Sequence, residues 1–271
     1  MAKTSSTNGS DSADYSKLLT DYKADLIKKA EKIVLEEFPK RVIKFNDLLE
    51  DEQFSYDLLS TYLPDLEFNL PRPLEDIPKL NSPKEEGEPS KKRKRAEKHD
   101  SDLIVESSSE VAVSGTPVYG FVNGSVKCNT KLAALTDQVR PMLRDAVEDV
   151  NKVKMWILFL IPRIEDGNNF GVSIQEETLS EVRTVESEAA SFLDQMSRYF
   201  VSRARLVTKV AKYPHVDDYR RAIMDLDEKQ FINIRLVLTE MRNHFATLHD
   251  MITKNMEKIK KPRSSNHDHM Y

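Results

Sequence analysis

The chain has 271 residues, of which 32% are charged and 39% apolar, and it has only 7 glycines, a mixture that favours long amphipathic helices over a sheet protein. Its formal net charge of −4 is too small to indicate a nucleic-acid binder, and no apolar run approaches the roughly 18 residues that a membrane span requires. The single cysteine, Cys128, excludes an internal disulfide and indicates a reducing compartment.

One helical pattern with polar flanks occupies the first quarter of the chain. Residues 1–13 have no apolar region of the kind that a secretory signal needs, and we expect a disordered tail there. Within residues 14–68, apolar side chains recur every three or four positions, which predicts the first helix of a bundle. Pro39 predicts a kink or a break in it. The stripe comprises Leu19, Tyr22, Leu26, Ala30, Ile33, Phe38, Val42, Phe45 and Leu49.

Residues 69–128 change in composition and form an insert. As far as Glu110 the segment is rich in Pro, Ser, Lys and Glu, so it cannot bury enough apolar surface to fold, and we expect disorder. The part around Asn123-Gly124 is interpreted as an extended segment with a turn. The segment contains a basic run that predicts recognition by a nuclear import receptor, formed by Lys91, Lys92, Arg93, Lys94 and Arg95.

This basic run has two other interpretations. It could be a solvated charge run without a partner, and that alternative stays open at the level of sequence. Nucleic-acid binding is less well supported, because no aromatic residues interleave with the charges. The basic run therefore favours a nuclear location.

Residues 129–262 carry three long helical patterns. Asn129 is placed to cap the first of them, Pro141 interrupts the pattern locally, and Pro162 ends it, because proline disfavours helix at the residue before it. The apolar stripe of this helix comprises Leu132, Leu135, Val139, Leu143, Ala146, Val150, Val153, Ile157 and Leu160.

The second and third of these patterns are just as regular. Ser173 to Glu176 has capping-box spacing and predicts the start of the second, whose stripe Arg203 interrupts. Asp217 or Asp218 is expected to cap the third, which Pro262 ends. The two stripes comprise Val182, Val185, Ala189, Phe192, Met196, Tyr199, Leu206 and Val210, then Tyr219, Ile223, Leu226, Ile234, Val237, Met241, Phe245, Leu248, Ile252, Met256 and Ile259.

These patterns predict an all-α fold, an elongated up-and-down four-helix bundle. Each of the last three helices extends over about 35 to 45 residues, or roughly 50 to 65 Å at the helical rise. Helices joined by short loops pack as antiparallel neighbours. So thin a bundle cannot hide all the apolar surface of such long helices, and we expect assembly into an oligomer.

The search for catalytic chemistry gives negative results. The sequence has no glycine-rich phosphate loop and no Gly-x-Ser-x-Gly motif. Cys128 lies in a polar turn without a neighbouring base. His244 and His249 face different sides of one helix, and His267 and His269 flank Asp268 in a polar tail. We therefore predict no catalytic residue, no metal site and no cofactor.

The stretch IPRIEDGNNFGVSIQEE, residues 161–177, is the exception in an otherwise helical region. It holds the only two glycines after Gly124. An ordinary interhelical turn explains Gly167, which permits a positive φ, and the asparagines, which tolerate one. Such a turn does not require Phe170 beside the two glycines. A short rigid loop at the end of a bundle suits insertion into a partner. Both interpretations stay open on these residues alone.

This stretch, together with KYPHVDDYR at residues 212–220 and the ending HDMITKNMEKIKKPRSS, resembles the 11S proteasome activators, also called REG proteins. The resemblance is close over residues 130–265 and looser over the first helix. KKRKR in the insert and RTVESEAASFLDQMSRYF are most similar to the gamma, nuclear, type.

The resemblance implies a function without catalysis. Members form heptameric rings that dock on the outer ring of the 20S proteasome and open its entry pore without ATP. By resemblance, the activation loop is Arg163, Ile164, Glu165, Asp166, Gly167, Asn168, Asn169, Phe170 and Gly171, and the docking tail, residues 263–271, ends in His269, Met270 and Tyr271. Gamma-type members favour trypsin-like cleavage and are associated with ubiquitin-independent turnover of nuclear proteins.

Two features of the sequence depart from the family pattern. The insert at residues 69–110 differs from that of the vertebrate gamma type, and the tail carries two histidines that the family does not lead us to expect. An alternative function remains, a nuclear helical ring that binds partners without opening a gate.

Overall fold

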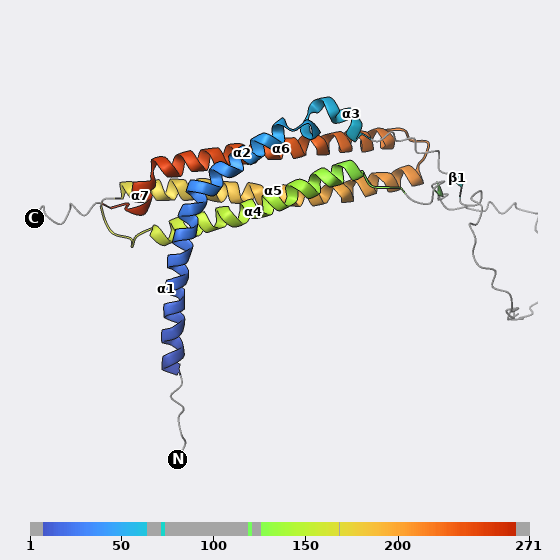
Figure 1. Cartoon of the computed structure of the whole chain (residues 1–271). Coiled ribbons are helices and arrows are strands. Elements are labelled where there is room, and N and C mark those ends of the chain that lie inside the picture. Colours follow the sequence, from blue (N-terminus) through green and yellow to red (C-terminus); the bar gives the residue numbers. More distant parts are fainter. Residues whose placement is uncertain (1–7, 64–71, 74–118, 121–125, 168, 264–271) are drawn as a thin grey trace, which may run out of the picture.

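The computed structural model describes residues 8–63, 72–73, 119–120, 126–167 and 169–263. Within these ranges the chain is an elongated bundle of long helices, with one helical arm leaving it sideways (Figure 1). The predicted all-α four-helix bundle is therefore confirmed. No helix in the described part of the chain is long and apolar enough to cross a membrane.

The first helix is continuous but changes character before Pro39. Helix α1 (Asn8–Lys32) passes into a π-helical segment, Ile33–Glu37, and then into α2 (Phe38–Glu50). Proline has no backbone N–H to give to the carbonyl four residues earlier, so the α-helical ladder cannot continue unchanged. Instead, the N–H of Phe38 bonds to the carbonyl of Ile33, five residues back. Figure 1 shows the chain changing direction at this place, as Pro39 predicts.

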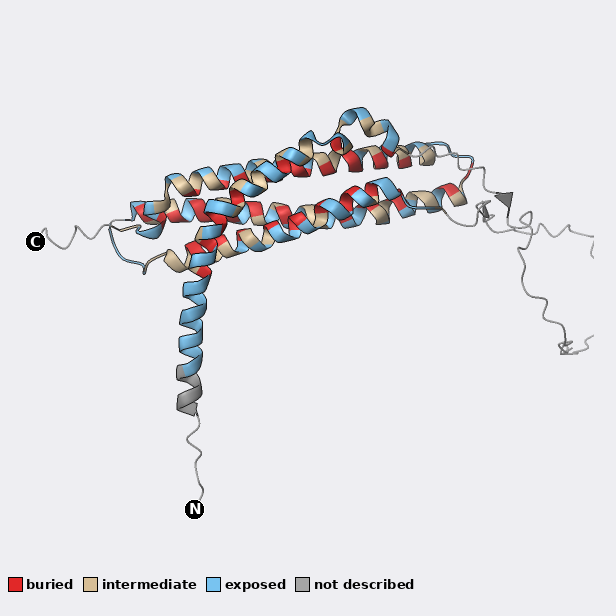
Figure 2. Cartoon of the chain, in the orientation of Figure 1, coloured by how far each residue is buried: buried red, intermediate tan, exposed pale blue. Residues whose placement is uncertain are grey.

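The N-terminal half of α1 lies outside the bundle. Residues 14–25 are all exposed, and we call this segment the N-terminal arm. Figure 2 shows it as a pale blue helix beneath a bundle that buries its inner face. The apolar stripe predicted for this helix thus enters the core only from Leu26 onward, while Leu19 and Tyr22 remain 53% and 54% exposed.

Short turns and a small ladder connect α2 to the rest of the bundle. Two 3₁₀ turns, Glu52–Phe54 and Tyr56–Leu58, lead into α3 (Leu59–Tyr62). Two described pieces of the insert pair with each other: β1 (Arg72–Pro73), in the part for which the sequence predicts disorder, lies antiparallel to β2 (Tyr119–Gly120), in the part predicted to be extended. The turn expected at Asn123-Gly124 lies outside the described residues.

Helix α4 (Thr130–Leu160) starts and stops where the sequence predicts. The side chain of Asn129 accepts a hydrogen bond from the backbone N–H of Leu132, at 3.1 Å, and so caps the helix. The predicted interruption at Pro141 is absent, since the helix continues through it. Pro141 is exposed, so water can reach the carbonyl that it leaves without a helical donor.

Helices α5 (Phe170–Lys212) and α6 (Asp218–Lys254) complete the bundle. Asp217 precedes α6 without a side-chain cap bond. The last predicted helix is interrupted at Asn255, after which α7 (Met256–Lys260) adds a short final turn before Pro262. Helix α5 packs between α4 and α6, and α2 packs along α6.

A single apolar core extends along the bundle. Its largest fully buried side chains include Trp156 of α4, Phe38 and Phe45 of the first helix, and Phe245 of α6. Phe245 contacts both phenylalanines, with ring centroids 4.9 Å from Phe38 and 6.1 Å from Phe45. The helical stripes predicted for α4, α5 and α6 supply most of this core.

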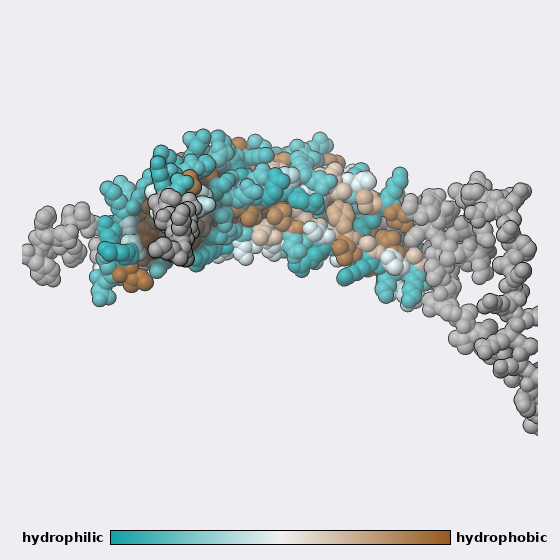
Figure 3. Space-filling view, turned by 90° about the horizontal axis from the view of Figure 1, so that it is seen from below, coloured by the Kyte–Doolittle hydropathy of each residue, from teal (hydrophilic) through white to brown (hydrophobic). Residues whose placement is uncertain are grey.

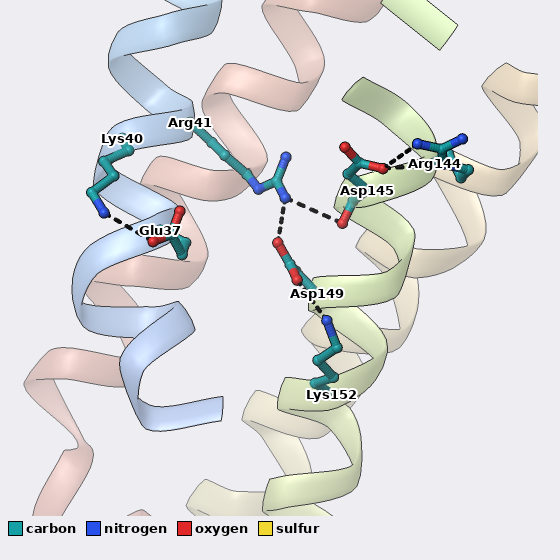
Figure 4. Close-up of polar contacts among 7 residues, drawn as sticks. All are labelled: Glu37, Lys40, Arg41, Arg144, Asp145, Asp149 and Lys152. Atoms are coloured by element: carbon teal, nitrogen blue, oxygen red, sulfur yellow. Dashed lines mark hydrogen bonds and ion pairs between the residues drawn. The ribbon is translucent and has the colours of Figure 1, made fainter. Parts of the chain in front are cut away.

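A polar contact fastens α2 to α4 just beyond the bend. The guanidinium of Arg41 points from α2 toward α4, where it bonds to the carboxylate of Asp149 and to the carbonyl of Asp145 (Figure 4). Asp149 also accepts from Lys152 of its own helix, at 3.0 Å. Because Arg41 stacks over the ring of Phe245, at 5.6 Å, this contact orients the first helix against the core.

Candidate functional site

The loop between α4 and α5 lies at the end of the bundle where the last helix also ends (Figure 1). Ile161, directly before Pro162, has an extended backbone with φ −64° and ψ 122°. Its N–H still bonds to the carbonyl of Ile157, which is the last helical bond of α4. Pro162 therefore sets the position of the loop, because it pushes the preceding residue out of the helical region.

The loop reverses at Gly167 and re-enters helix earlier than the sequence predicts. Gly167 has a φ of +80°, and a Cβ there would meet no atom within 4 Å, so conformation and not space requires glycine. Helix α5 begins at Phe170, three residues before the predicted capping box. The Ser173 hydroxyl does not cap a helix start; it donates to the carbonyl of Asn169 at 3.2 Å, within the first turn of α5.

Two large apolar side chains project from this short loop. Ile164 is fully exposed, and Phe170 is 73% exposed at the first position of α5. Single exposed apolar residues are common on protein surfaces. These two, however, lie close together, one before and one after the turn at Gly167. They give the loop an apolar contact surface that an ordinary turn does not need.

Gly171 is required for a different reason than Gly167. It is buried, and a Cβ placed on it would overlap the carbonyl oxygen of Pro262 and lie 2.6 Å from the Pro262 Cα. The backbone that follows α7 therefore crosses directly over the first turn of α5. We call residues 261–263 the tail root, since the rest of the C-terminal tail follows from them.

The tail root also contacts the loop through its arginine. Arg263 donates from Nη1 to Oε2 of Glu165, at 2.9 Å, and from Nη2 to Oδ1 of Asn169, at 3.2 Å. Arg163 reaches the other carboxylate oxygen of Glu165, at 3.4 Å. These side chains border a surface hollow of about 310 Å³ between the loop and the start of α5.

Beneath the loop, Gln175 joins three helices. Its side-chain amide is buried and donates to the carbonyl of Leu160, at 3.0 Å, and to that of Ile259, at 2.7 Å. Both are carbonyls near helix ends, where intrahelical donors run out. One side chain of α5 thus caps the end of α4 and the end of α7, and fixes both ends of the loop relative to the tail root.

The opposite end of the bundle holds a buried polar network. Asp227 of α6 is fully buried and accepts from Nε of Arg203, at 3.0 Å, and from the hydroxyl of Tyr199, at 2.8 Å. Asn129 donates to the same carboxylate, at 3.2 Å, and to the carbonyl of Tyr62. Burial, followed by the hydrogen bond to Asp227, raises the pKa of the Tyr199 phenol above its ordinary range. The network joins α5, α6 and α3 with the residue that precedes α4.

Comparison with known proteins decides the family. The family described as "Proteasome activator PA28, C-terminal" matches residues 125–269, and "Proteasome activator PA28, N-terminal" matches residues 13–73. The chain belongs to the PA28 proteasome activator family. The resemblance found in the sequence, to the 11S activators and their gamma type, is confirmed.

Relatives of the PA28 chain match along nearly its full length. It is 45% identical over 250 residues to "Proteasome activator complex subunit 3" of Homo sapiens, and the match covers 92% of this chain and 93% of that protein. The Gallus gallus protein of the same name matches with the same identity and coverage. The crystal structure of the 11S subunit of the Plasmodium falciparum proteasome, PA28, is 28% identical with a TM-score of 0.67, over 97% of this chain and 100% of that one.

A more distant structure shares the fold alone. A chain of the structure of an archaebacterial 20S proteasome–PA26 complex is 15% identical with a TM-score of 0.51, over 54% of this chain and 73% of that one. The helical bundle is thus retained at low sequence identity.

Of the nine residues predicted for the activation loop, eight are described in this PA28 chain, and the structure brings them to one end of the bundle. Asn168 lies outside the described residues, as do His269, Met270 and Tyr271 of the docking tail and the basic run of residues 91–95. Their roles remain predictions.

Sequence reasoning missed the residues that hold this end together. The sequence pattern places Gln175 in a capping box and Arg263 at the start of a tail. It marks Arg203 only as a break in an apolar stripe. A polar residue on an apolar stripe signals a buried partner, but the sequence alone does not say that the partner is Asp227.

Proposed function

We propose that this chain is a non-catalytic, ATP-independent activator of the 20S proteasome, one that promotes degradation of peptides and of proteins without ubiquitin. The observation that carries the proposal is its membership of the PA28 family over both family regions, joined to 45% identity with proteasome activator subunits over 92% of the chain. The loop and the tail root at one end of the bundle supply the two elements that such a function needs.

Assembly into a heptameric ring is part of the proposal. The N-terminal arm supports it, because apolar side chains at helical spacing are more than half exposed there, namely Tyr15, Leu18, Leu19 and Tyr22. In the view of Figure 3, apolar patches also interrupt a mostly hydrophilic face of the bundle. A helix with such a face gains stability when a neighbouring subunit covers it.

The proposed mechanism separates docking from gate opening. The C-terminal tails, ending in Tyr271, bind the outer-ring subunits of the proteasome, and the terminal carboxylate makes charge-assisted contacts there. Seven weak contacts act together through their high effective concentration. The activation loops then favour the open gate, and they do so only as far as they bind it better than the closed gate.

The chain itself acts as a regulator of an endopeptidase and not as an enzyme in this proposal. The described residues around the loop are an ion pair, amide groups and apolar side chains, which suit recognition of another protein. Peptide-bond cleavage takes place in the proteasome, and by resemblance to the gamma type we expect the trypsin-like activity to rise most.

A nuclear location completes the proposal. The run KKRKR at residues 91–95 supports it, since five consecutive basic side chains match the acidic grooves of import receptors. A fusion of residues 85–100 to a fluorescent protein tests it. Nuclear accumulation that is lost when the five basic residues become alanine supports the prediction, and an even distribution of the parent fusion contradicts it.

The first experiment mixes the purified chain with latent 20S proteasome and follows a short fluorogenic peptide with a basic residue before the cleaved bond. We expect strong acceleration without ATP. An intact ring that gives no acceleration would contradict the proposal and favour the alternative, a nuclear ring scaffold that binds partners without opening a gate.

An Asn168→Tyr variant then tests the loop. We expect it to bind the proteasome without accelerating hydrolysis, because a bulky side chain at the turn changes the surface that meets the gate. Asn243→Tyr, at an exposed position on α6, is the matched control and should activate normally. Full activation by Asn168→Tyr would show that the loop is assigned incorrectly.

A further inference from the structure

The tail root and the loop are in direct contact, although about 90 positions separate them in the sequence. The Pro262 backbone lies against Gly171, at a distance that leaves no room for a Cβ. This contact involves main-chain atoms on the Pro262 side, which cannot move aside as a flexible side chain can. A displacement of the tail root must therefore displace the first turn of α5, or break the contact.

Arg263 extends this contact to both sides of the turn. Glu165 precedes Gly167 and Asn169 follows it, and the guanidinium of Arg263 bonds to both side chains, at 2.9 and 3.2 Å. The planar guanidinium presents its donors in a fixed fork, so the two acceptors are held at a defined separation. Arg263 thus bridges the base of the loop, from Glu165 before the turn to Asn169 after it.

The Gln175 side chain connects the helix ends next to this contact. Gln175 bonds to the last turn of α4 through Leu160 and to the last turn of α7 through Ile259. The loop begins after the first of these helices, and the tail root follows the second. Arg263 therefore connects the tail root to the loop directly, and Gln175 connects the two helix ends that precede them. We expect loop and tail root to move together.

We propose that Arg263 is a positioning residue that couples docking of the C-terminal tail to the conformation of the activation loop. The inference rests on the proposed activator function and adds a regulatory contact to it. Arg263 holds Glu165 and Asn169 so that the loop presents one conformation to the gate when the tail is bound. Docking affinity comes from the residues beyond Arg263, and efficient gate opening requires the contact that Arg263 makes.

The test compares Arg263→Ala with the wild-type chain in the proteasome assay, over a range of activator concentrations. We expect the maximal acceleration to fall by roughly fivefold, the effect of losing two half-exposed hydrogen bonds to one charged group. We expect the concentration for half-maximal activation to change by less than about twofold, because the tail that docks is intact. Lys258→Ala, an exposed neighbour of like charge on α7 and outside the tail root, is the control and should leave both quantities unchanged.

A second variant guards against loss of folding or assembly. Arg263→Lys keeps the charge but cannot fork to two acceptors. Both variants are checked for heptamer mass and melting temperature before assay. An intermediate maximum for Arg263→Lys, with an unchanged half-maximal concentration, supports the inference. Wild-type maxima for both variants overturn it.

A double-mutant cycle with Glu165→Ala shows whether Arg263 acts through the loop. We expect the double variant to lose less activation than the product of the two single reductions, since Glu165→Ala already removes one of the two acceptors of Arg263. Reductions that multiply would show that Arg263 acts independently, for instance by touching the proteasome itself, and would overturn the proposal. If the wild-type ring does not accelerate hydrolysis at all, the proposed function itself is contradicted. That result is distinct from a wild-type ring that activates while Arg263→Ala and Arg263→Lys activate equally well, which contradicts only the role of Arg263.

Discussion

The two ends of this bundle use polar groups in opposite ways. At the far end, Arg203 and Asp227 form an ion pair whose side chains are 7% and 0% exposed, and their other partners are Tyr199, Asn129 and the carbonyl of Lys127. At the loop end, Arg263 pairs with a Glu165 side chain that is 51% exposed, and the contact borders an open hollow. The ion pair at the far end is buried, whereas the loop end has Ile164, Phe170 and the Glu165 carboxylate at its surface.

This difference separates stability from function. A buried charge pair is costly to break, because removal of one partner leaves the other charge in the core without compensation. A half-exposed pair contributes little to stability, because water solvates both groups when the contact breaks. We therefore expect loss of the buried Arg203–Asp227 pair to reduce the free energy of unfolding, and loss of the half-exposed Arg263–Glu165 pair to change mainly the activation of the proteasome.

The largest effect is expected at the far end. Asp227→Ala leaves Arg203 buried without its carboxylate, and should lower the free energy of unfolding by about 3–5 kcal/mol. Denaturant unfolding at a fixed protomer concentration measures the change. Asp225→Ala, which removes an exposed carboxylate of the same helix, is the control and should change stability by less than about 0.5 kcal/mol. Equal effects from the two variants would contradict the contrast between the ends.

At the loop end, the two glycines should respond differently. Gly171→Ala forces its Cβ into the Pro262 backbone, so we expect a loss of about 1–3 kcal/mol of stability and a severe loss of maximal activation. Gly167→Asn has open space and a side chain that tolerates a positive φ, so its stability should stay within about 1 kcal/mol of wild type. Melting temperatures and the peptide assay compare them. A fully active Gly171→Ala ring would show that the crossing of the tail root is dispensable.

A smaller effect is expected from the residue that caps two helices. Gln175→Met keeps the side-chain volume but removes the donor that Leu160 and Ile259 share, which should reduce stability by about 1–3 kcal/mol. Hydrogen exchange should also become faster at the last turns of α4 and α7. Gln195→Met, at an exposed position of α5, is the control. Unchanged exchange at both helix ends would contradict the assigned role.

The smallest effect depends on pH. Partial burial alone raises the pKa of Glu186, but the hydrogen bonds from Lys154 and Asn151 outweigh it and lower that pKa. Such a carboxyl contributes stability above its unfolded pKa, about 4.3, and the contribution is lost as pH falls through the folded value.

Glu186→Gln should therefore be less stable than wild type by less than about 1 kcal/mol at neutral pH, and the difference should shrink below about pH 4. Melting curves of both proteins across this range measure it, with Glu177→Gln at an exposed position of α5 as the control. A difference that is constant with pH would show that ionisation of Glu186 is not involved.

Local patterns were enough to determine the helices of this protein and the position of its loop. Apolar periodicity predicts the core faces of α4, α5 and α6, because a helix repeats every 3.6 residues whatever it packs against. Asn129 and Pro162 mark the start and the end of α4 by effects that act within a few residues. The predicted loop residues come from a stretch that is contiguous in the sequence, and the structure keeps all the described ones together.

Tertiary structure alone decided which residues meet across the chain. The same periodicity continues through the N-terminal arm and the buried part of α1, yet only the second of these enters the core. Gly171 is needed because the backbone after α7 crosses it, and Arg203 is tolerated because Asp227 of another helix faces it. Such pairings depend on how whole helices pack, and the physical reason they escape a sequence pattern is that burial and charge compensation are set by neighbours distant along the chain.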